Sequence, residues 1–86
     1  MSRYRIELLK TAKKELAKLS QQIQRRIAAK IDSLLIEPYP PNCKKLINGN
    51  GRFRIRVGDY RIIYRVEDEQ LVILVIQIGH RRDVYK

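Results

Sequence analysis

The chain has 86 residues, and its 19 lysines and arginines against 9 aspartates and glutamates give a formal net charge of +10. A chain of this length builds one core, so we expect a single domain over residues 1–86. One cysteine and one histidine exclude an internal disulfide and a zinc site made by this chain alone, and no apolar run has the length of a signal peptide or a membrane span. We therefore expect a cytoplasmic protein that binds no membrane, metal or cofactor.

The first half of the chain predicts one strand and two amphipathic helices. Alternation of polar and apolar residues from Arg3 to Leu8 is typical of a strand. Apolar residues then recur at helical spacing, first Ala12, Leu16 and Leu19, then Ile23, Ile27, Ile31, Leu34 and Leu35. Ser20 is placed to cap the second helix, which the prolines at positions 38, 40 and 41 end. The basic residues of both helices, Arg26 and Lys30 among them, are expected mostly on outer, solvated faces.

The second half predicts antiparallel strands. Residues 52–65, RFRIRVGDYRIIYR, alternate with a period of two, and the Gly58-Asp59 pair suits a two-residue type II′ hairpin turn. Residues 71–78 form a nearly continuous apolar run, which is typical of a central strand. We therefore expect an α+β domain of order βααβββ, with two N-terminal helices packed on one face of a small antiparallel sheet.

The hairpin register places like charges opposite each other. If Val57 lies opposite Tyr60, then Arg56 faces Arg61 and, further along the hairpin, two more arginines face each other at positions 52 and 65. The other face of the hairpin is apolar, with Phe53, Ile55, Val57, Tyr60, Ile62 and Tyr64. Opposed like charges destabilise a sheet, so their presence indicates a polyanionic partner. Residues 44–65 carry seven basic side chains and one acidic side chain, which is the charge pattern of a phosphate-binding surface.

The C-terminal segment IGHRRDVY supplies further candidates. Because the helices cover one face of the sheet, the arginine face should be open, and Gly79 would allow the tail to turn over it. The tail would then bring His80, Arg81 and Tyr85 close to the three arginines at positions 54, 56 and 61.

This set of side chains fits the cleavage of RNA. RNA carries its own nucleophile, the 2′-hydroxyl group, so an enzyme has to align it, stabilise the added negative charge and move two protons. Arginines bind phosphate oxygens but stay protonated at neutral pH, so Tyr85 or His80 would have to handle the proton. Other readings stay open: the arginines could form a solvated or protein-docking face, His80 could be an ordinary surface residue, and Tyr85 could simply pack the tail.

Three segments, SLLIEPYPPNCKKL, RFRIRVGDYRIIYRV and IGHRRDVY, resemble the RelE/ParE superfamily of toxins, and the RelE branch in particular. The resemblance extends over essentially the whole chain. It implies the toxin of a type II toxin-antitoxin system that binds the ribosome and cleaves messenger RNA in the A site, leaving a 2′,3′-cyclic phosphate. It also implies a RelB-like antitoxin partner, small, acidic and helical.

The resemblance implies specific roles for residues. Catalytic positions of the family match Arg54, Arg56, Arg61, Arg81 and Tyr85, with His80 as the reserve candidate, and RNA-binding residues are expected at Lys44, Lys45, Arg52, Arg65 and Arg82. Some members have lysines at positions 54 and 56, where the arginines of this chain cannot serve as a base. Two alternatives remain: a ParE-like toxin that inhibits gyrase without nuclease activity, and a non-catalytic RNA-binding module.

Overall fold

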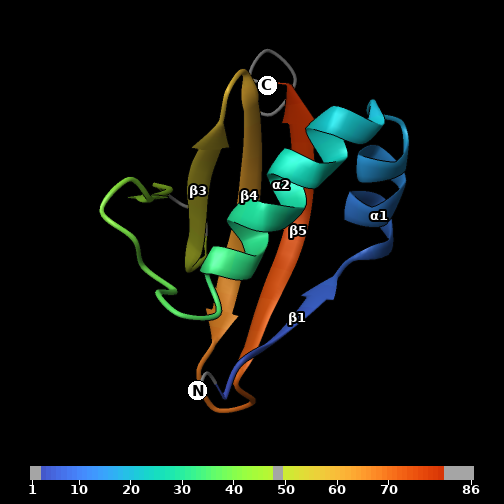
Figure 1. Ribbon diagram of the computed structural model, residues 1–86. Helices are drawn as coiled ribbons and strands as arrows, with labels where there is room; N and C mark the ends of the chain where they lie inside the picture. Colours follow the sequence, from blue (N-terminus) through green and yellow to red (C-terminus); the bar gives the residue numbers. More distant parts are fainter. Residues whose placement is uncertain (1–2, 48–49, 81–86) are drawn as a thin grey trace.

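The computed structural model of the protein describes residues 3–47 and 50–80 (Figure 1). Its elements are β1 (Arg5–Leu8), α1 (Lys10–Ala17), α2 (Gln21–Ser33), β2 (Lys44–Lys45), β3 (Arg52–Val57), β4 (Tyr60–Glu67) and β5 (Val72–His80). The strands form one sheet of five in the order β1-β5-β4-β3-β2. Both helices lie over one face of this sheet in Figure 1, which confirms the predicted α+β class. Neither helix is long and apolar enough to cross a bilayer.

The sheet is antiparallel except at one edge. Strands β3, β4 and β5 form the expected antiparallel meander. Strand β1 pairs with β5 in parallel, with Arg5 opposite Val72. Parallel strands need a long connection, and the chain between β1 and β5 includes both helices. At the other edge, Lys44 and Lys45 of β2 pair with β3. The sequence pattern did not predict this two-residue strand, which is too short to produce an alternation of its own.

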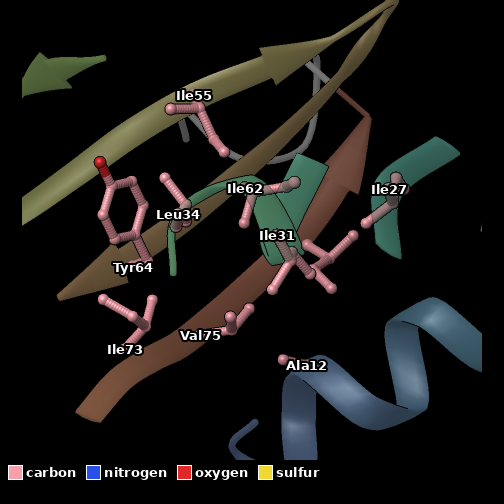
Figure 2. Close-up of a cluster of buried hydrophobic side chains, with 10 residues drawn as sticks. Ala12, Ile27, Ile31, Leu34, Ile55, Ile62, Tyr64, Ile73 and Val75 are labelled. Atoms are coloured by element: carbon pink, nitrogen blue, oxygen red, sulfur yellow. The ribbon is translucent and has the colours of Figure 1, made fainter. Parts of the chain in front are cut away.

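The core lies between the helices and the apolar face of the sheet. Figure 2 shows Ile27, Ile31 and Leu34 of the helical segment packed against side chains of the strands, and the buried cluster as a whole contains Ala12, Ile27, Ile31, Leu34, Ile55, Ile62, Tyr64, Ile73, Val75 and Ile78. The predicted cap of α2 is confirmed, because the backbone N–H of Ile23 donates to Ser20 Oγ at 3.3 Å. The apolar face predicted for the hairpin is therefore the face that the helices cover.

Strand β5 continues further than the sequence predicted. Gly79 and His80 remain in the ladder, opposite Arg61 and Tyr60 of β4. The chain therefore does not leave the sheet at Gly79, where the sequence would have allowed a sharp turn. The hairpin extends to its turn at Gly58-Asp59, so β4 still offers backbone partners at this level, and hydrogen bonding keeps the glycine in the strand.

Tyr64 joins the sheet to the connection that carries β2. Its side chain is fully buried, and its hydroxyl donates a hydrogen bond to the Pro38 carbonyl oxygen at 2.7 Å. The Tyr64 ring lies 6.0 Å from that of Phe53, whose ring in turn meets Tyr39 at 5.0 Å between centroids. Burial, with the nearby Cys43 thiol, raises the pKa of the Tyr64 phenol above its ordinary value.

We expect Tyr64→Phe to lower the free energy of unfolding by about 1–2 kcal/mol, because it leaves the Pro38 carbonyl without its donor. The native state holds the phenolic proton more tightly than the unfolded chain, so stability should fall as the pH rises above about 10, and Tyr64→Phe should reduce that fall. Urea denaturation at several pH values measures both effects. Tyr39→Phe, at a residue 47% exposed, is the matched control and should change the free energy of unfolding little at neutral pH.

Candidate phosphate-binding site

Strands β2, β3 and β4 and the segment after β2 form a pocket of about 360 Å³. It is lined by Lys44, Lys45, Leu46, Ile47, Arg54, Arg56 and Arg61. Five of these residues are basic and none is acidic. We call it the cationic pocket. Its field attracts anions, and its guanidinium groups have the geometry to bind phosphate oxygens in pairs.

The turn of the hairpin sets the positions of the arginines. Gly58 has a φ of +58°, while Asp59 is not among the residues with positive φ, as a two-residue turn with glycine first requires. The predicted register is confirmed, with Val57 opposite Tyr60 and Arg56 opposite Arg61. Because neighbouring residues of a strand point to opposite faces, this register sends the arginines away from the helices.

Two pairs of like charges meet at the cationic pocket. One is the predicted pair of Arg56 and Arg61. The other was not predicted: β2 places Lys44 directly opposite Arg54. Opposed like charges each cost a few tenths of a kcal/mol, up to about 1 kcal/mol, so the pocket is electrostatically unfavourable when it is empty.

Arg54 is the most unusual residue of the pocket. It is only 7% exposed, and it is the one charged residue in the buried class within the described part of the chain. Its Nε atom is buried and has no hydrogen-bond partner among the described residues. A desolvated, unpaired cation is costly to a fold and binds an anion strongly, since it has little water to lose. Within the cationic pocket, a phosphate oxygen would therefore bind most favourably at Arg54.

The predicted RNA-binding residues divide into two groups. Lys44 and Lys45 line the cationic pocket. Arg52 and Arg65 face each other at the far end of the hairpin and do not line it. Arg65 donates through Nε to Glu67 Oε1 at 2.7 Å, and the same carboxylate forms an ion pair with its guanidinium group. The charge of Arg65 is thus already balanced within β4.

His80 does not lie with the arginines. It ends β5 opposite Tyr60, with a ring separation of 5.6 Å, and so shares the helix-facing side of the sheet with that residue. It lines a separate pocket of about 350 Å³ together with Glu15 and Lys18 of the α1 region. The expectation that His80 joins Arg54, Arg56 and Arg61 was wrong in this respect, because β5 runs straight through Gly79. The remaining predicted positions, Arg81, Arg82 and Tyr85, lie outside the described residues.

Sequence reasoning missed two features near these pockets. Ile47 lines the cationic pocket and is 91% exposed, so an apolar side chain stands beside the cations. The only signal was its place directly after the Lys44-Lys45 pair. On the helix side, Glu15 accepts a hydrogen bond from the backbone N–H of Ile78 at 3.0 Å, beyond the point where β1 stops pairing with β5. Among the described residues there is no group of three or more side chains suited to holding a metal ion.

Comparison with known proteins places the chain in a toxin family. Residues 6–85 match the family described as ParE toxin of type II toxin-antitoxin system, parDE. Toxin RelG of Mycobacterium tuberculosis is 30% identical over 96% of this chain and 97% of its own length. The mRNA interferase toxin RelE of Escherichia coli is 28% identical over 91% of this chain and 83% of its own length.

Solved structures agree with this placement. In the RelE-RelB complex from Pyrococcus horikoshii, the similar chain is 31% identical, with a TM-score of 0.80 over 94% of this chain and 98% of its own. The fold and the matched sequence together define a small toxin of a type II toxin-antitoxin system. The chain belongs to the RelE/ParE toxin family, as its sequence predicted.

We expect Arg54→Met to keep the free energy of unfolding unchanged or to raise it by about 1 kcal/mol, because methionine fills the space without a buried cation. Inorganic phosphate should stabilise the parent more than this variant, since binding to the folded state adds to stability. Denaturation in phosphate and in chloride at equal ionic strength measures the difference. Arg25→Met, at an exposed residue of α2, corrects for general salt effects. Equal stabilisation of Arg54→Met and the parent would argue against a phosphate site at Arg54.

Proposed function

We propose that this toxin is a ribosome-dependent endoribonuclease that cleaves messenger RNA in the A site. In the proposed reaction the 2′-hydroxyl oxygen attacks the adjacent phosphorus, the bond to the 5′ oxygen breaks, and the products are a 2′,3′-cyclic phosphate and a 5′-hydroxyl. This chemistry requires no metal. The observation that carries the proposal is Arg54, whose buried Nε atom has no partner among the described residues, in a pocket that five cations and no described carboxylate line. The name of the relative from Escherichia coli, an mRNA interferase toxin, agrees with it.

The arginines would act on charge and alignment. The scissile phosphate gains negative charge as the 2′ oxygen attacks, and fixed guanidinium groups stabilise that charge without having to reorganise. Arg54 and Arg56 from β3 and Arg61 from β4 approach this phosphate from two strands of a rigid hairpin. Lys44 and Lys45 would hold neighbouring phosphates. Arg81 adds a further cation by its match to the family motif.

Two protons have to move in the proposed reaction. One leaves the attacking 2′-hydroxyl group, and one must reach the departing 5′ oxygen. Guanidinium groups stay protonated at neutral pH and cannot accept the first proton, so another side chain is needed. We assign the transfer of protons to Tyr85, which matches a tyrosine of the family motif. The position of His80 on the helix-facing side of the sheet, beside Tyr60, argues against a direct role for the histidine.

The partner that restrains the toxin would be an acidic, largely helical antitoxin of the RelB type. The similar structure from Pyrococcus horikoshii is a complex of RelE with RelB. A net charge of +10, with six of these charges in residues 44–65, favours an acidic partner. Covering the hairpin with carboxylates would also relieve the repulsion between Arg56 and Arg61.

One observation favours the ParE alternative. The family that residues 6–85 match is described as ParE toxin of type II toxin-antitoxin system. A gyrase inhibitor acts by protein contact and has no need for a buried cation in a pocket. Arg54 therefore favours the RelE reading. A non-catalytic RNA-binding module would present aromatic rings for stacking, whereas Tyr60 and Tyr64 lie on the core face of the hairpin.

Primer extension on a translated message tests the proposal. We expect new 3′ ends at A-site codons when ribosomes are present, and far fewer without them. Arg61→Ala should lower cleavage about 10- to 100-fold through loss of one transition-state contact, and should weaken ribosome binding only modestly. Equal losses in binding and cleavage would indicate a docking role for Arg61. Intact message together with inhibited gyrase would support the ParE reading instead.

The identity of the proton handler has a separate signature. We expect Tyr85→Phe to abolish most of the single-turnover rate on ribosome-bound message, whereas His80→Gln should change it little, because His80 faces away from the cationic pocket. With a tyrosine as base, the rate should keep rising above pH 7. Loss of most of the rate in His80→Gln, with a mild effect of Tyr85→Phe, would assign the role to the histidine instead.

A further inference from the structure

A second basic pocket lies between α2 and the tip of the hairpin. Its volume is about 510 Å³, and its lining residues are Arg26, Ala29, Lys30, Ser33, Arg56, Val57 and Gly58. Three of these residues are cations and none is a carboxylate. The sequence pattern assigned Arg26 and Lys30 to an ordinary solvated helix face. The structure instead groups them with an arginine of the sheet.

The helix sets the placement of these two residues. Arg26 and Lys30 are four residues apart, so their side chains lie on the same face of α2. Arg26 and Lys30 each directly precede a buried residue of α2, Ile27 and Ile31. Their side chains therefore lie beside the buried face of the helix, next to the edge of the sheet. Like charges at this spacing destabilise a helix slightly, as the opposed arginines do in the hairpin.

Arg26 reaches the hairpin turn itself. A Cβ atom added to Gly58 would lie 3.3 Å from Arg26 Nη2, so the absence of a side chain at Gly58 leaves room for the guanidinium group. Asp59 is the neighbouring carboxylate in sequence, yet among the described residues neither Arg26 nor Lys30 forms an ion pair. Within the described part of the chain, the charges of Arg26 and Lys30 are therefore not balanced by an ion pair.

Arg56 connects the two basic pockets, since it lines both. Strand β2 pairs with Phe53 and Arg54, and no other described strand pairs with the edge of β3 beyond Arg54. An anionic chain that leaves the cationic pocket can therefore pass Arg56 at this edge and meet the cations of α2. A single anion needs one pocket, whereas a chain with a phosphate at every nucleotide can occupy both.

We propose that Arg26 and Lys30, together with Arg56, form a second phosphate subsite that binds the backbone of single-stranded RNA next to the scissile nucleotide. The inference rests on the proposed RNA substrate and adds two residues of α2 to its binding surface. The subsite would contribute to affinity and to the direction in which the strand crosses the sheet. Arg26 and Lys30 themselves would not take part in the bond-breaking step, whereas Arg56 would contact both phosphates.

The test compares two variants that lose the same charge. Arg26→Ala with Lys30→Ala removes the helix half of the subsite, and Lys13→Ala with Lys14→Ala removes two exposed cations of α1 outside both pockets. The probe is a fluorescent, uncleavable 2′-O-methyl oligonucleotide of twelve residues, titrated at several salt concentrations. A dinucleotide with one phosphate serves as the short probe.

We expect the subsite variant to bind the long probe about 5- to 20-fold more weakly, and its logarithmic salt dependence to fall by about 0.7 to 1.4 for the loss of one or two phosphate contacts. The control variant should lose less than about twofold, and both variants should bind the dinucleotide as the parent does. Arg26→Lys with Lys30→Arg keeps the charges and should retain most of the affinity.

Equal losses in the two double variants would overturn the subsite, because they would reflect net charge alone. Loss of antitoxin binding with unchanged RNA binding would also overturn it and mark the pocket as a protein contact. The unfolding free energy of each variant checks that it is folded. Failure of the parent to cleave message on ribosomes would contradict the proposed activity, while the oligonucleotide titration would still decide whether the subsite binds RNA.

Discussion

The opposition of Arg56 and Arg61 across the β3–β4 hairpin is the constraint on which the rest of the site depends. The turn at Gly58, with glycine as its first residue, fixes this register. Because side chains alternate along a strand, every arginine of the hairpin then points to the face of the sheet away from the helices. Arg54, two residues before Arg56 on β3, adds a buried cation to the same face. No carboxylate lines the cationic pocket among the residues that the structure describes, so the field of the pocket attracts an external anion.

The opposite face of the same hairpin offsets this cost. Ile55, Ile62 and Tyr64 are fully buried against the helices, so each strand contributes apolar burial on one side while it presents cations on the other. The hydrogen bond from Tyr64 to the Pro38 carbonyl holds the connection that brings β2 beside Arg54. The core therefore stabilises the fold and also holds in place the connection that carries β2, which lines one side of the cationic pocket. This division of the hairpin explains how a chain of 86 residues can maintain an unfavourable surface.

The sequence predicted those features that short-range chemistry determines. The turn residues and the period of two gave the hairpin register, and Ser20 gave the start of α2. It did not predict contacts that depend on the tertiary structure: the parallel pairing of β1, the two-residue strand β2, and the approach of Arg26 to Gly58. The position of His80 was missed for a related reason. A glycine permits a sharp turn but does not require one, and the pairing of Gly79 with Arg61 keeps β5 straight.

The most direct test of the central claim is a double-mutant cycle on the free energy of unfolding, using Arg56→Ala, Arg61→Ala and the double variant. We expect the two arginines to repel each other by about 0.2–1 kcal/mol at low salt, and this coupling to disappear in 1 M salt, where charges are screened within about 3 Å. A coupling that is favourable, or one that does not change with salt, would contradict the claim that this surface is held against its own repulsion for an anionic ligand.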